Sequence, residues 1–228
     1  MDISPLLLPS FGRRHGRTLR PAQKALFTEV LPRLLITLPE GNLSLQELFL
    51  HPDRPLWVEI GFGAGEHLLE QARRNPEVNF IGCEPYINGV ATLLAGVKQH
   101  NLSNIRILEE DARLLLLKLP DNSIERLFIL FPDPWRKNRH HKRRIIAPPS
   151  LPIFYAKLKQ GGKLRIATDH YDYGVWILEN MLLFRQLRWL ATRHTDWENP
   201  PEGWVPTRYQ AKALAQEREP LFLEYIKD

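Results

Sequence analysis

The sequence predicts an α/β fold built on a mostly parallel sheet. From about residue 56 onward, short apolar runs alternate with amphipathic stretches, which is the pattern of repeated β-α-β units. One of these runs, residues 124–131, is apolar enough to be buried on both faces, as parallel strands covered by helices are. With 228 residues, 43% of them apolar, the chain can form one domain around a sizeable core.

The expected elements follow the chain in this order. Residues 21–38 have apolar positions at helical spacing, with a break near Pro32. Strands are expected at 56–60, 78–84, 104–111, 124–131 and 163–169. Helices are expected at 64–74, 87–99, 114–117, 150–159 and 172–183, and Gly161 and Gly162 are expected to stop the helix at 150–159. Two further strands are expected at 185–192 and 222–227, a loop at 195–210, and an extended or mobile start at 1–20.

A glycine-rich turn follows the first expected strand. Residues 58–66 read VEIGFGAGE, and Gly61, Gly63 and Gly65 allow a sharp turn and a close approach of the backbone to a ligand. A glycine triad alone is not specific. Four consecutive expected strands also end in, or are followed by, an acid: Glu59, Glu84, Asp111 and Asp133. Because ligands of open parallel sheets bind at the carboxyl ends of the strands, these residues predict a site there.

The acids argue against a phosphate ligand. A dinucleotide would meet Glu59 and Glu84 with unfavourable charge, and no Walker lysine follows the glycines. Glu84 stands at the distance from the glycines at which an acid accepts hydrogen bonds from both ribose hydroxyls. S-adenosylmethionine, which carries a sulfonium, an amino group, a ribose and an adenine, fits these groups better. The alternative for Glu59 is a capping acid near a helix start.

Residues 131–144 read FPDPWRKNRHHKRR and combine a rigid turn with dense positive charge. The prolines fix the backbone on either side of Asp133, and the ring of Trp135 can stack on a purine. Residues 136–144 hold six cations and no acid: Arg136, Lys137, Arg139, Lys142, Arg143 and Arg144. A polyanion would relieve their repulsion by releasing counterions, whereas a solvated loop is the alternative.

The composition narrows the class of protein further. The formal net charge is +5, and residues 13–24 form a second basic stretch without an acid, as in proteins that bind polyanions. The chain has a single cysteine, Cys83, which excludes an intramolecular disulfide and favours a reducing compartment. We expect Cys83 to be buried and to pack in the core. We expect a cytoplasmic protein without signal peptide or membrane span. We expect no metal site at His140 and His141, since the only cysteine lies elsewhere.

Taken together, these segments resemble the bacterial single-subunit tRNA (guanine-N7)-methyltransferases. The resemblance covers nearly the whole chain: FGRRHGR and LRPAQ near the start, VEIGFGAGEHL, GCEPY, the EEDA strand end, FPDPWRKNRHHKRR, GGKLRIATDH and the tail WVPTRYQAKAL. The segment from FPDPW to KRR is highly specific. The glycine triad marks only the broader class of S-adenosylmethionine-dependent methyltransferases.

The resemblance implies a Rossmann-like class I methyltransferase fold, with a mostly parallel seven-stranded sheet and helices on both faces. It implies a basic extension and helix at residues 1–54 and a methyltransferase domain at 55–228. The implied reaction transfers the methyl group of S-adenosylmethionine to N7 of guanine 46 in the variable loop of tRNA. No obligate protein partner is expected.

The resemblance also implies roles for particular residues. Asp133 is the expected catalytic residue. The expected cofactor-binding residues are Glu59, Gly61, Gly63, Gly65, Glu84, Asp111 and Asp133. The expected substrate-binding residues are Lys137, Asp169, Thr207, Arg208, Tyr209 and Gln210. The expected RNA-interacting residues are Arg139, His140, His141, Lys142, Arg143 and Arg144. Gln210 departs from the family pattern, which has Glu at this position, so its role is open.

Two rival functions use only part of this pattern. A small-molecule methyltransferase would need the glycines and acids but not the basic segment. A non-catalytic RNA-binding protein would need the basic segment but not the acids. An NAD-dependent enzyme fits neither Glu59 nor the glycine spacing, which is not G-x-G-x-x-G.

Overall fold

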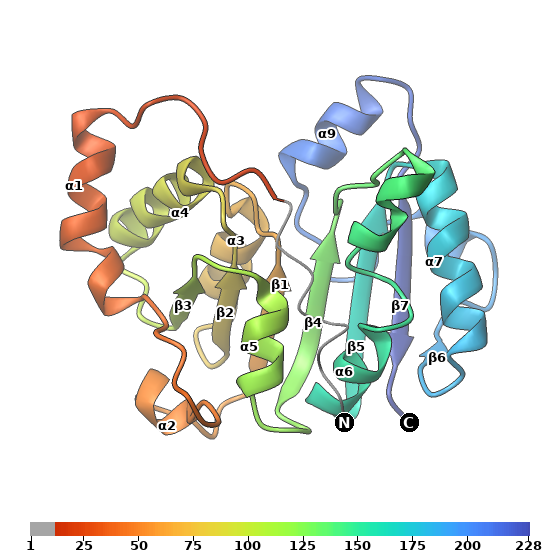
Figure 1. The fold of residues 1–228 in the computed structure, drawn as a ribbon, viewed down its shortest axis with the longest axis horizontal. Coiled ribbons are helices and arrows are strands. Elements are labelled where there is room, and N and C mark those ends of the chain that lie inside the picture. The colour runs from red at the N-terminus through yellow and green to blue at the C-terminus, as the bar shows by residue number, and fades with distance from the viewer. Residues whose placement is uncertain (1–11) are drawn as a thin grey trace. The chain divides into compact units, whose positions relative to one another are not determined.

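The structure is a computed structural model that describes residues 12–228. The predictions for residues 1–11, the first part of the expected extension, lie outside the described residues. From residue 12 onward the chain forms two compact units, an N-terminal unit of residues 12–120 and a C-terminal unit of residues 121–228. Figure 1 shows the helices and strands of each.

The N-terminal unit has a parallel sheet with helices on both faces. Its strands are β1 (Leu56–Ile60), β2 (Asn79–Cys83) and β3 (Ile105–Leu108), and β2 pairs with the other two. Its helices are α1 (Pro21–Glu29), the short 3₁₀ helix η2 (Leu31–Arg33), α2 (Leu45–Leu48), α3 (Glu66–Arg74), α4 (Ile87–His100) and α5 (Ala112–Lys118). In Figure 1, α5 lies in front of this sheet, and α3 and α4 lie behind it. Every residue of β2 is therefore buried.

The residues before β1 are part of this unit. Leu35 forms a parallel bridge with Ile107 of β3, and two backbone hydrogen bonds of 2.8 Å surround it. Leu34 and Ile36 on either side are buried. This stretch thus continues the sheet past β3, while the basic residues near Gly16 stay exposed.

The C-terminal unit has a mixed sheet with the strand order β4-β5-β7-β6. Its strands are β4 (Ile124–Leu130), β5 (Leu158–Thr168), β6 (Arg188–Trp189) and β7 (Leu221–Ile226). β4 and β5 are parallel, whereas β7 runs antiparallel to β5 and to β6. Its helices are η3 (Asn138–Arg143), α6 (Leu151–Lys157), α7 (Tyr171–Leu183), α8 (Thr195–Glu198) and α9 (Arg208–Leu214).

The predicted fold class is confirmed. The described residues contain seven strands, mostly parallel, with helices between them. The strands predicted at 56–60, 78–84, 124–131 and 222–227 match β1, β2, β4 and β7 to within a residue at each end. The helix predicted at 21–38 is broken at Pro32, as expected, because α1 ends at Glu29 and η2 follows. Cys83 is buried, as predicted.

Four predicted boundaries were wrong. The helix expected at 150–159 ends at Lys157, and β5 begins at once. Gly161 and Gly162 therefore lie inside β5, where the β4–β5 register shifts at a bulge, instead of stopping a helix. The loop expected at 195–210 contains α8 and the start of α9, and the strand expected at 185–192 shrinks to Arg188–Trp189. The strand expected at 104–111 ends at Leu108.

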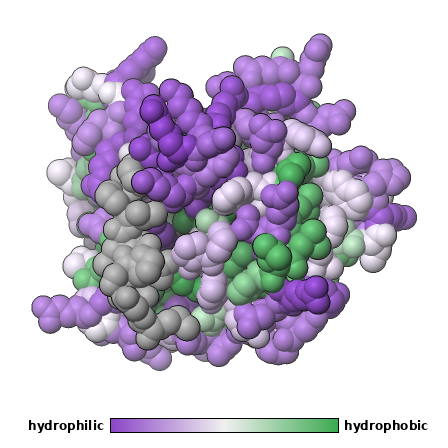
Figure 2. Space-filling view, turned by 45° about the vertical axis from the view of Figure 1, so that its right-hand side comes forward, coloured by the Kyte–Doolittle hydropathy of each residue, from purple (hydrophilic) through white to green (hydrophobic). Residues whose placement is uncertain are grey.

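Helix α7 is buried along one side only. Tyr173, Ile177 and Met181 face the core, and four large apolar side chains on the helix are exposed: Tyr171, Val175, Leu182 and Leu183. Apolar residues gather in one area of the surface in the view of Figure 2. Within residues 12–228, none of the helices has the length and apolar character needed to cross a membrane.

The last strand completes the C-terminal unit. β7 lies between β5 and β6, although it follows both in the sequence. Directly after it, Lys227 is buried, and its Nζ donates hydrogen bonds to Asn122 Oδ1, Tyr155 O and Leu158 O at 2.8, 2.9 and 2.8 Å. The buried ammonium thus has three acceptors, from the residues before β4, from α6 and from the start of β5.

Candidate active site

The glycine turn after β1 has a backbone that glycine adopts without strain. Gly61, Gly63 and Gly65 have φ angles of 73°, 58° and 80°, all in the left-handed region. A side chain at Gly65 would collide with α4, because its Cβ would lie 2.8 Å from Leu93 Cδ1. A Cβ at Gly61 would meet no described atom within 4 Å. A ligand can therefore approach the backbone at Gly61.

Glu84 directly follows β2 and holds the glycine turn in shape. Its Oε2 accepts a hydrogen bond from the backbone N–H of Gly63 at 2.8 Å, and its Oε1 accepts one from Tyr86 at 2.9 Å. These two bonds fix the carboxylate of Glu84 beside the glycine turn.

Glu59 lies within β1 and is only 4% exposed. Its Oε2 is 2.6 Å from Nδ1 of His67 in α3. The alternative reading of Glu59 as a helix cap does not match this geometry, because the N-cap residue of α3 is Gly65 and no side chain caps that helix. Glu59 therefore has a buried partner on the helix that follows the glycines.

Asp111 lies at the start of α5, three residues beyond the end of β3, instead of ending a strand as predicted. It is the N-cap residue, and its Oδ1 accepts a hydrogen bond from the backbone N–H of Arg113 at 2.9 Å. The guanidinium of Arg113 also forms an ion pair with the same carboxylate. Like Glu84, Asp111 is oriented by donors of the protein itself.

The loop after β4, residues 131–135, is strained on both sides of Asp133. Phe131 and Trp135 have φ angles of 51° and 47°, which are costly for residues with a large side chain. The Phe131 N–H donates to Ala167 O at 2.7 Å, which fixes the start of the loop to β5. Strain of this kind persists only where the surrounding structure enforces it, and it clusters at functional sites. We call residues 131–135 the Asp133 loop.

Asp133 itself is exposed at the tip of this loop. Desolvation by the surrounding chain raises the pKa of its carboxyl group above the ordinary value. The environment thus disfavours the charged form. A positive charge that develops next to this carboxylate would favour its charged form again.

The basic segment, residues 136–144, folds as a loop and the 3₁₀ helix η3. Lys137, Arg139 and Lys142 are exposed, so they can reach a polyanion. His140 and His141 contact different rings, those of Trp135 and Trp176, at centroid distances of 6.0 and 5.4 Å.

Trp135 is contacted from within the basic segment. The guanidinium of Arg143 lies 5.0 Å from the centre of the Trp135 ring, a cation–π contact. Desolvation, together with nearby cations of which Arg143 is the strongest, lowers the pKa of His140. A purine that stacked on Trp135 would share this ring with Arg143 and His140.

Arg144 is placed differently from the rest of the basic segment. It is 4% exposed, and its guanidinium lies between the rings of Tyr173 and Trp176 on α7, at 4.8 and 4.9 Å. Its Nε donates to the carbonyl oxygen of Pro134 at 2.9 Å. The RNA contact at Arg144 stays a prediction, and the buried side chain also supports the Asp133 loop through its bond to Pro134.

Asp169 follows β5 and is paired within the protein. Its Oδ2 is 2.8 Å from Nη1 of Arg218, which comes from the segment between α9 and β7. Desolvation, and after it the charge of Arg136, lowers the pKa of the neighbouring His170. The charge of Asp169 is therefore balanced by Arg218, and a substrate that contacts Asp169 would also meet this arginine.

The segment Thr207–Gln210 forms the start of α9. Thr207 is buried and caps the helix, with its Oγ1 accepting from the Gln210 N–H at 3.1 Å. Arg208 and Tyr209 are exposed. The side-chain Oε1 of Gln210 accepts a hydrogen bond from Trp204 Nε1 at 2.7 Å. An oxygen of either Gln or Glu could accept this bond, so the structure accommodates the departure from the family pattern.

Some residues of the site were not predicted from the sequence. His67, Arg113 and Arg218 each hold one of the predicted acids, and Tyr173 and Trp176 hold Arg144. The spacing of His67 from the glycine turn could have been a signal, because it places the ring on the first turn of the helix behind Glu59. Arg218 is far from Asp169 in sequence, and no local pattern links the two.

Comparison with known proteins identifies the family. A family model described as "Putative methyltransferase" matches residues 53–223. A protein of Hyphomonas neptunium named tRNA (guanine-N(7)-)-methyltransferase is 43% identical over 205 residues, which cover 90% of this chain and 93% of that protein. The chain belongs to the tRNA (guanine-N7)-methyltransferase family. A member of this family from Rhodospirillum rubrum is 44% identical, covering 93% of this chain and 85% of that protein.

Solved structures show that the chain has the class I methyltransferase fold. The 16S rRNA methyltransferase KamB has a TM-score of 0.56 at 15% identity, covering 76% of this chain and 88% of that one. A 16S rRNA (adenine(1408)-N(1))-methyltransferase variant from Catenulisporales acidiphilia, solved with its cosubstrate SAM, has a TM-score of 0.57 at 13% identity, covering 82% and 92%. At this identity the likeness concerns the fold alone.

Proposed function

We propose that this chain transfers the methyl group of S-adenosylmethionine to N7 of guanine 46 in the variable loop of tRNA. The observation that carries the proposal is the Asp133 loop, where strained backbone presents an exposed acid directly before a run of exposed cations. A small-molecule enzyme would have no use for those cations. The names of the relatives support tRNA as the substrate and guanine N7 as the reacting atom.

The residues of the N-terminal unit fit S-adenosylmethionine. Gly61 leaves room for a ligand against the backbone. Glu84 and Asp111 present carboxylates that donors of the protein hold in one orientation, and carboxylates suit ribose hydroxyls and the amino groups of the ligand. When bound, S-adenosylmethionine supplies the methyl group. We propose that the cofactor-binding residues of this unit are Glu59, Gly61, Gly63, Gly65, Glu84 and Asp111. Asp133 of the C-terminal unit is proposed as a further cofactor contact.

Asp133 is the proposed catalytic residue, and its role is electrostatic. Guanine N7 has a lone pair and no proton, so the transfer needs alignment and charge stabilisation instead of a general base. The carboxylate of Asp133 can accept a hydrogen bond from the guanine edge and stabilise the positive charge that develops on the purine. Lys137, Asp169 and the segment Thr207–Gln210 are the proposed substrate contacts beside it.

The tRNA backbone is proposed to bind exposed cations. Lys137, Arg139 and Lys142 of the basic segment are exposed, and so are Arg13 and Arg14 of the N-terminal unit. The latter stretch is fixed rather than loose, because Ile87 N–H donates to Arg14 O at 3.0 Å. Contacts of this kind supply most of the sequence-independent affinity for nucleic acid.

The test is methyl transfer to unfractionated tRNA. The chain is incubated with labelled S-adenosylmethionine and tRNA, and the modified base is mapped by borohydride–aniline cleavage. We expect label in tRNA and cleavage at guanine 46. Cleavage at another guanine would overturn the position, whereas label in a metabolite pool but not in tRNA would favour a small-molecule methyltransferase.

Two further proposals concern the domain boundary and the location of the protein in the cell. We propose that residues 1–54 act as a basic extension to a methyltransferase domain at 55–228. The family model begins at residue 53, close to this boundary. We also propose a cytoplasmic location, which suits the single buried Cys83, since free thiols persist in a reducing compartment.

A further inference from the structure

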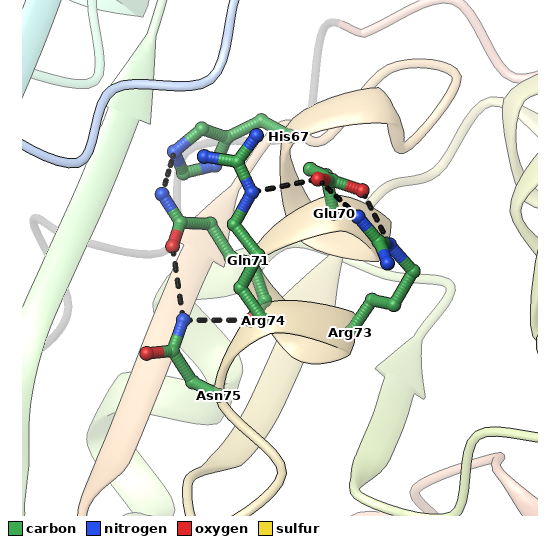
Figure 3. A network of polar contacts seen from close by, with 6 residues as sticks. All are labelled: His67, Glu70, Gln71, Arg73, Arg74 and Asn75. Atoms are coloured by element: carbon green, nitrogen blue, oxygen red, sulfur yellow. Dashed lines mark hydrogen bonds and ion pairs between the residues drawn. The ribbon is translucent and has the colours of Figure 1, made fainter.

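A buried polar network runs along one side of α3, directly after the glycine turn. His67, Gln71 and Asn75 are four residues apart and line up on the helix, as Figure 3 shows. His67 and Gln71 are 1% and 4% exposed. Polar side chains buried to this degree are costly unless each donor meets an acceptor. The network therefore has a defined direction, which can be worked out from its outer end.

The outer end fixes which way each amide faces. Asn75 Nδ2 lies 2.8 Å from the backbone oxygen of Gln71 and 3.3 Å from Gln71 Oε1. A backbone carbonyl can only accept, so this atom of Asn75 is the amide nitrogen, and Gln71 Oε1 is its second acceptor. The other side-chain atom of Gln71, Nε2, then donates to His67 Nε2 at 3.3 Å.

The histidine tautomer follows from that donor. Because His67 Nε2 accepts a hydrogen bond, the ring carries its proton on Nδ1. This Nδ1–H points at Glu59 Oε2, 2.6 Å away. The chain of donors thus runs from Asn75 through Gln71 and His67 to Glu59, and it ends on the acid that stands two residues before Gly61.

We propose that His67 is a positioning residue for the cofactor, which acts by holding the carboxylate of Glu59 in one orientation beside the glycine turn. The proposal rests on the proposed use of S-adenosylmethionine. Glu59 is buried and needs a donor in order to stay an oriented acceptor. Gln71 and Asn75 act one step further out, as outer-shell partners of a ligand-holding side chain commonly do, by keeping the His67 proton on Nδ1.

A second polar cluster on the same helix provides a matched control. Glu70 pairs with Arg73 and Arg74 at 2.8 and 2.6 Å. In Figure 3 these three side chains are not joined to the network of His67, Gln71 and Asn75. They are more exposed than His67. Glu70→Gln therefore perturbs α3 without touching the partner of Glu59.

The test is a double-mutant cycle read by calorimetric binding of S-adenosylmethionine to the full chain. His67→Leu and Glu59→Gln are each expected to weaken binding by roughly tenfold or more, and Glu70→Gln by less than about twofold. The double variant is expected to bind about as well as the weaker single variant, because His67 acts through Glu59. His67→Asn, whose amide can replace Nδ1–H, is expected to recover most of the affinity.

Three results would overturn the proposal. These are additive losses in the cycle, parent-like binding by His67→Leu, or a nitrogen NMR spectrum of the parent protein with the His67 proton on Nε2. The spectrum also decides the matter if His67→Leu fails to fold. If the parent chain itself does not bind S-adenosylmethionine, the proposed function fails. If the parent binds it and His67→Leu binds it equally well, only the role of His67 fails.

Discussion

The acids of the N-terminal unit and the acid of the Asp133 loop are held in opposite ways. Glu59, Glu84 and Asp111 each accept hydrogen bonds from donors of the same unit, and the first two are buried. Asp133 is exposed, and the backbone on either side of it is strained. The difference shows that side-chain and backbone donors orient the carboxylates of the N-terminal unit without a ligand. Asp133, in contrast, is positioned by the backbone of its loop.

The largest effect is expected at Asp133. Asp133→Asn removes the charge but keeps the shape, and we expect the rate of tRNA methylation at saturating cofactor to fall by about 100-fold or more. Because desolvation raises the pKa of Asp133, the parent enzyme should lose activity on acidification at a higher pH than an ordinary aspartate would dictate. The measurement is the pH profile of kcat. A parent-like rate for Asp133→Asn would show that the charge is not used.

The next effect tests how the Asp133 loop is supported. Arg144→Met removes the hydrogen bond to Pro134 O and the charge between Tyr173 and Trp176. We expect kcat to fall by about tenfold and the free energy of unfolding to fall by about 2 kcal/mol. The salt dependence of tRNA binding should stay unchanged. A flatter salt dependence would mean that Arg144 contacts the RNA after all.

A smaller effect is expected from the exposed cations of the same segment. Arg139→Ala and Lys142→Ala should each weaken tRNA binding and reduce its salt slope by about 1. Cofactor affinity and stability should not change, because neither side chain is buried. Filter binding over a range of salt concentrations gives the slope. An unchanged slope for both variants would place the RNA elsewhere.

The smallest effect concerns Glu70 in the N-terminal unit. Hydrogen bonds from Arg73 and Arg74 lower the pKa of its carboxyl group to about 2. A lowered carboxyl pKa stabilises the fold above the unfolded pKa, and this contribution is lost as the pH falls through the folded value. Glu70→Gln should therefore cost less than about 1 kcal/mol at neutral pH. The cost should shrink between about pH 4.5 and pH 2 in denaturant titrations, and a cost that does not change with pH would contradict the assignment.

Elements with a strong local pattern could be predicted from the sequence. β2 is buried throughout and is apolar after Asn79, and the left-handed turn at Gly61, Gly63 and Gly65 favours glycine. Gly161 and Gly162 misled the prediction, because glycine suits a bulge within a strand as well as a helix end. Each of these predictions depends on residues that are adjacent in the sequence.

The partners of the acids could not be predicted in the same way. Arg144 looks like its basic neighbours in the sequence, and only the packing of α7 shows that it is buried. The pairing of Asp169 with Arg218 depends on how the chain returns after α9. Whether a charged side chain faces solvent or another residue is decided by tertiary contacts, which residue type and spacing do not encode.

The position of β7 has a consequence for synthesis on the ribosome. β1, β2 and β3 are all complete by residue 108. Among the described strands, β6 pairs only with β7. The side-chain oxygen of Asn122 accepts its hydrogen bond from Lys227, which follows β7. Domains fold as their segments emerge, earlier segments first. The N-terminal unit can thus assemble while translation continues, and the half that carries Asp133 stays incomplete until residues 221–227 leave the exit tunnel.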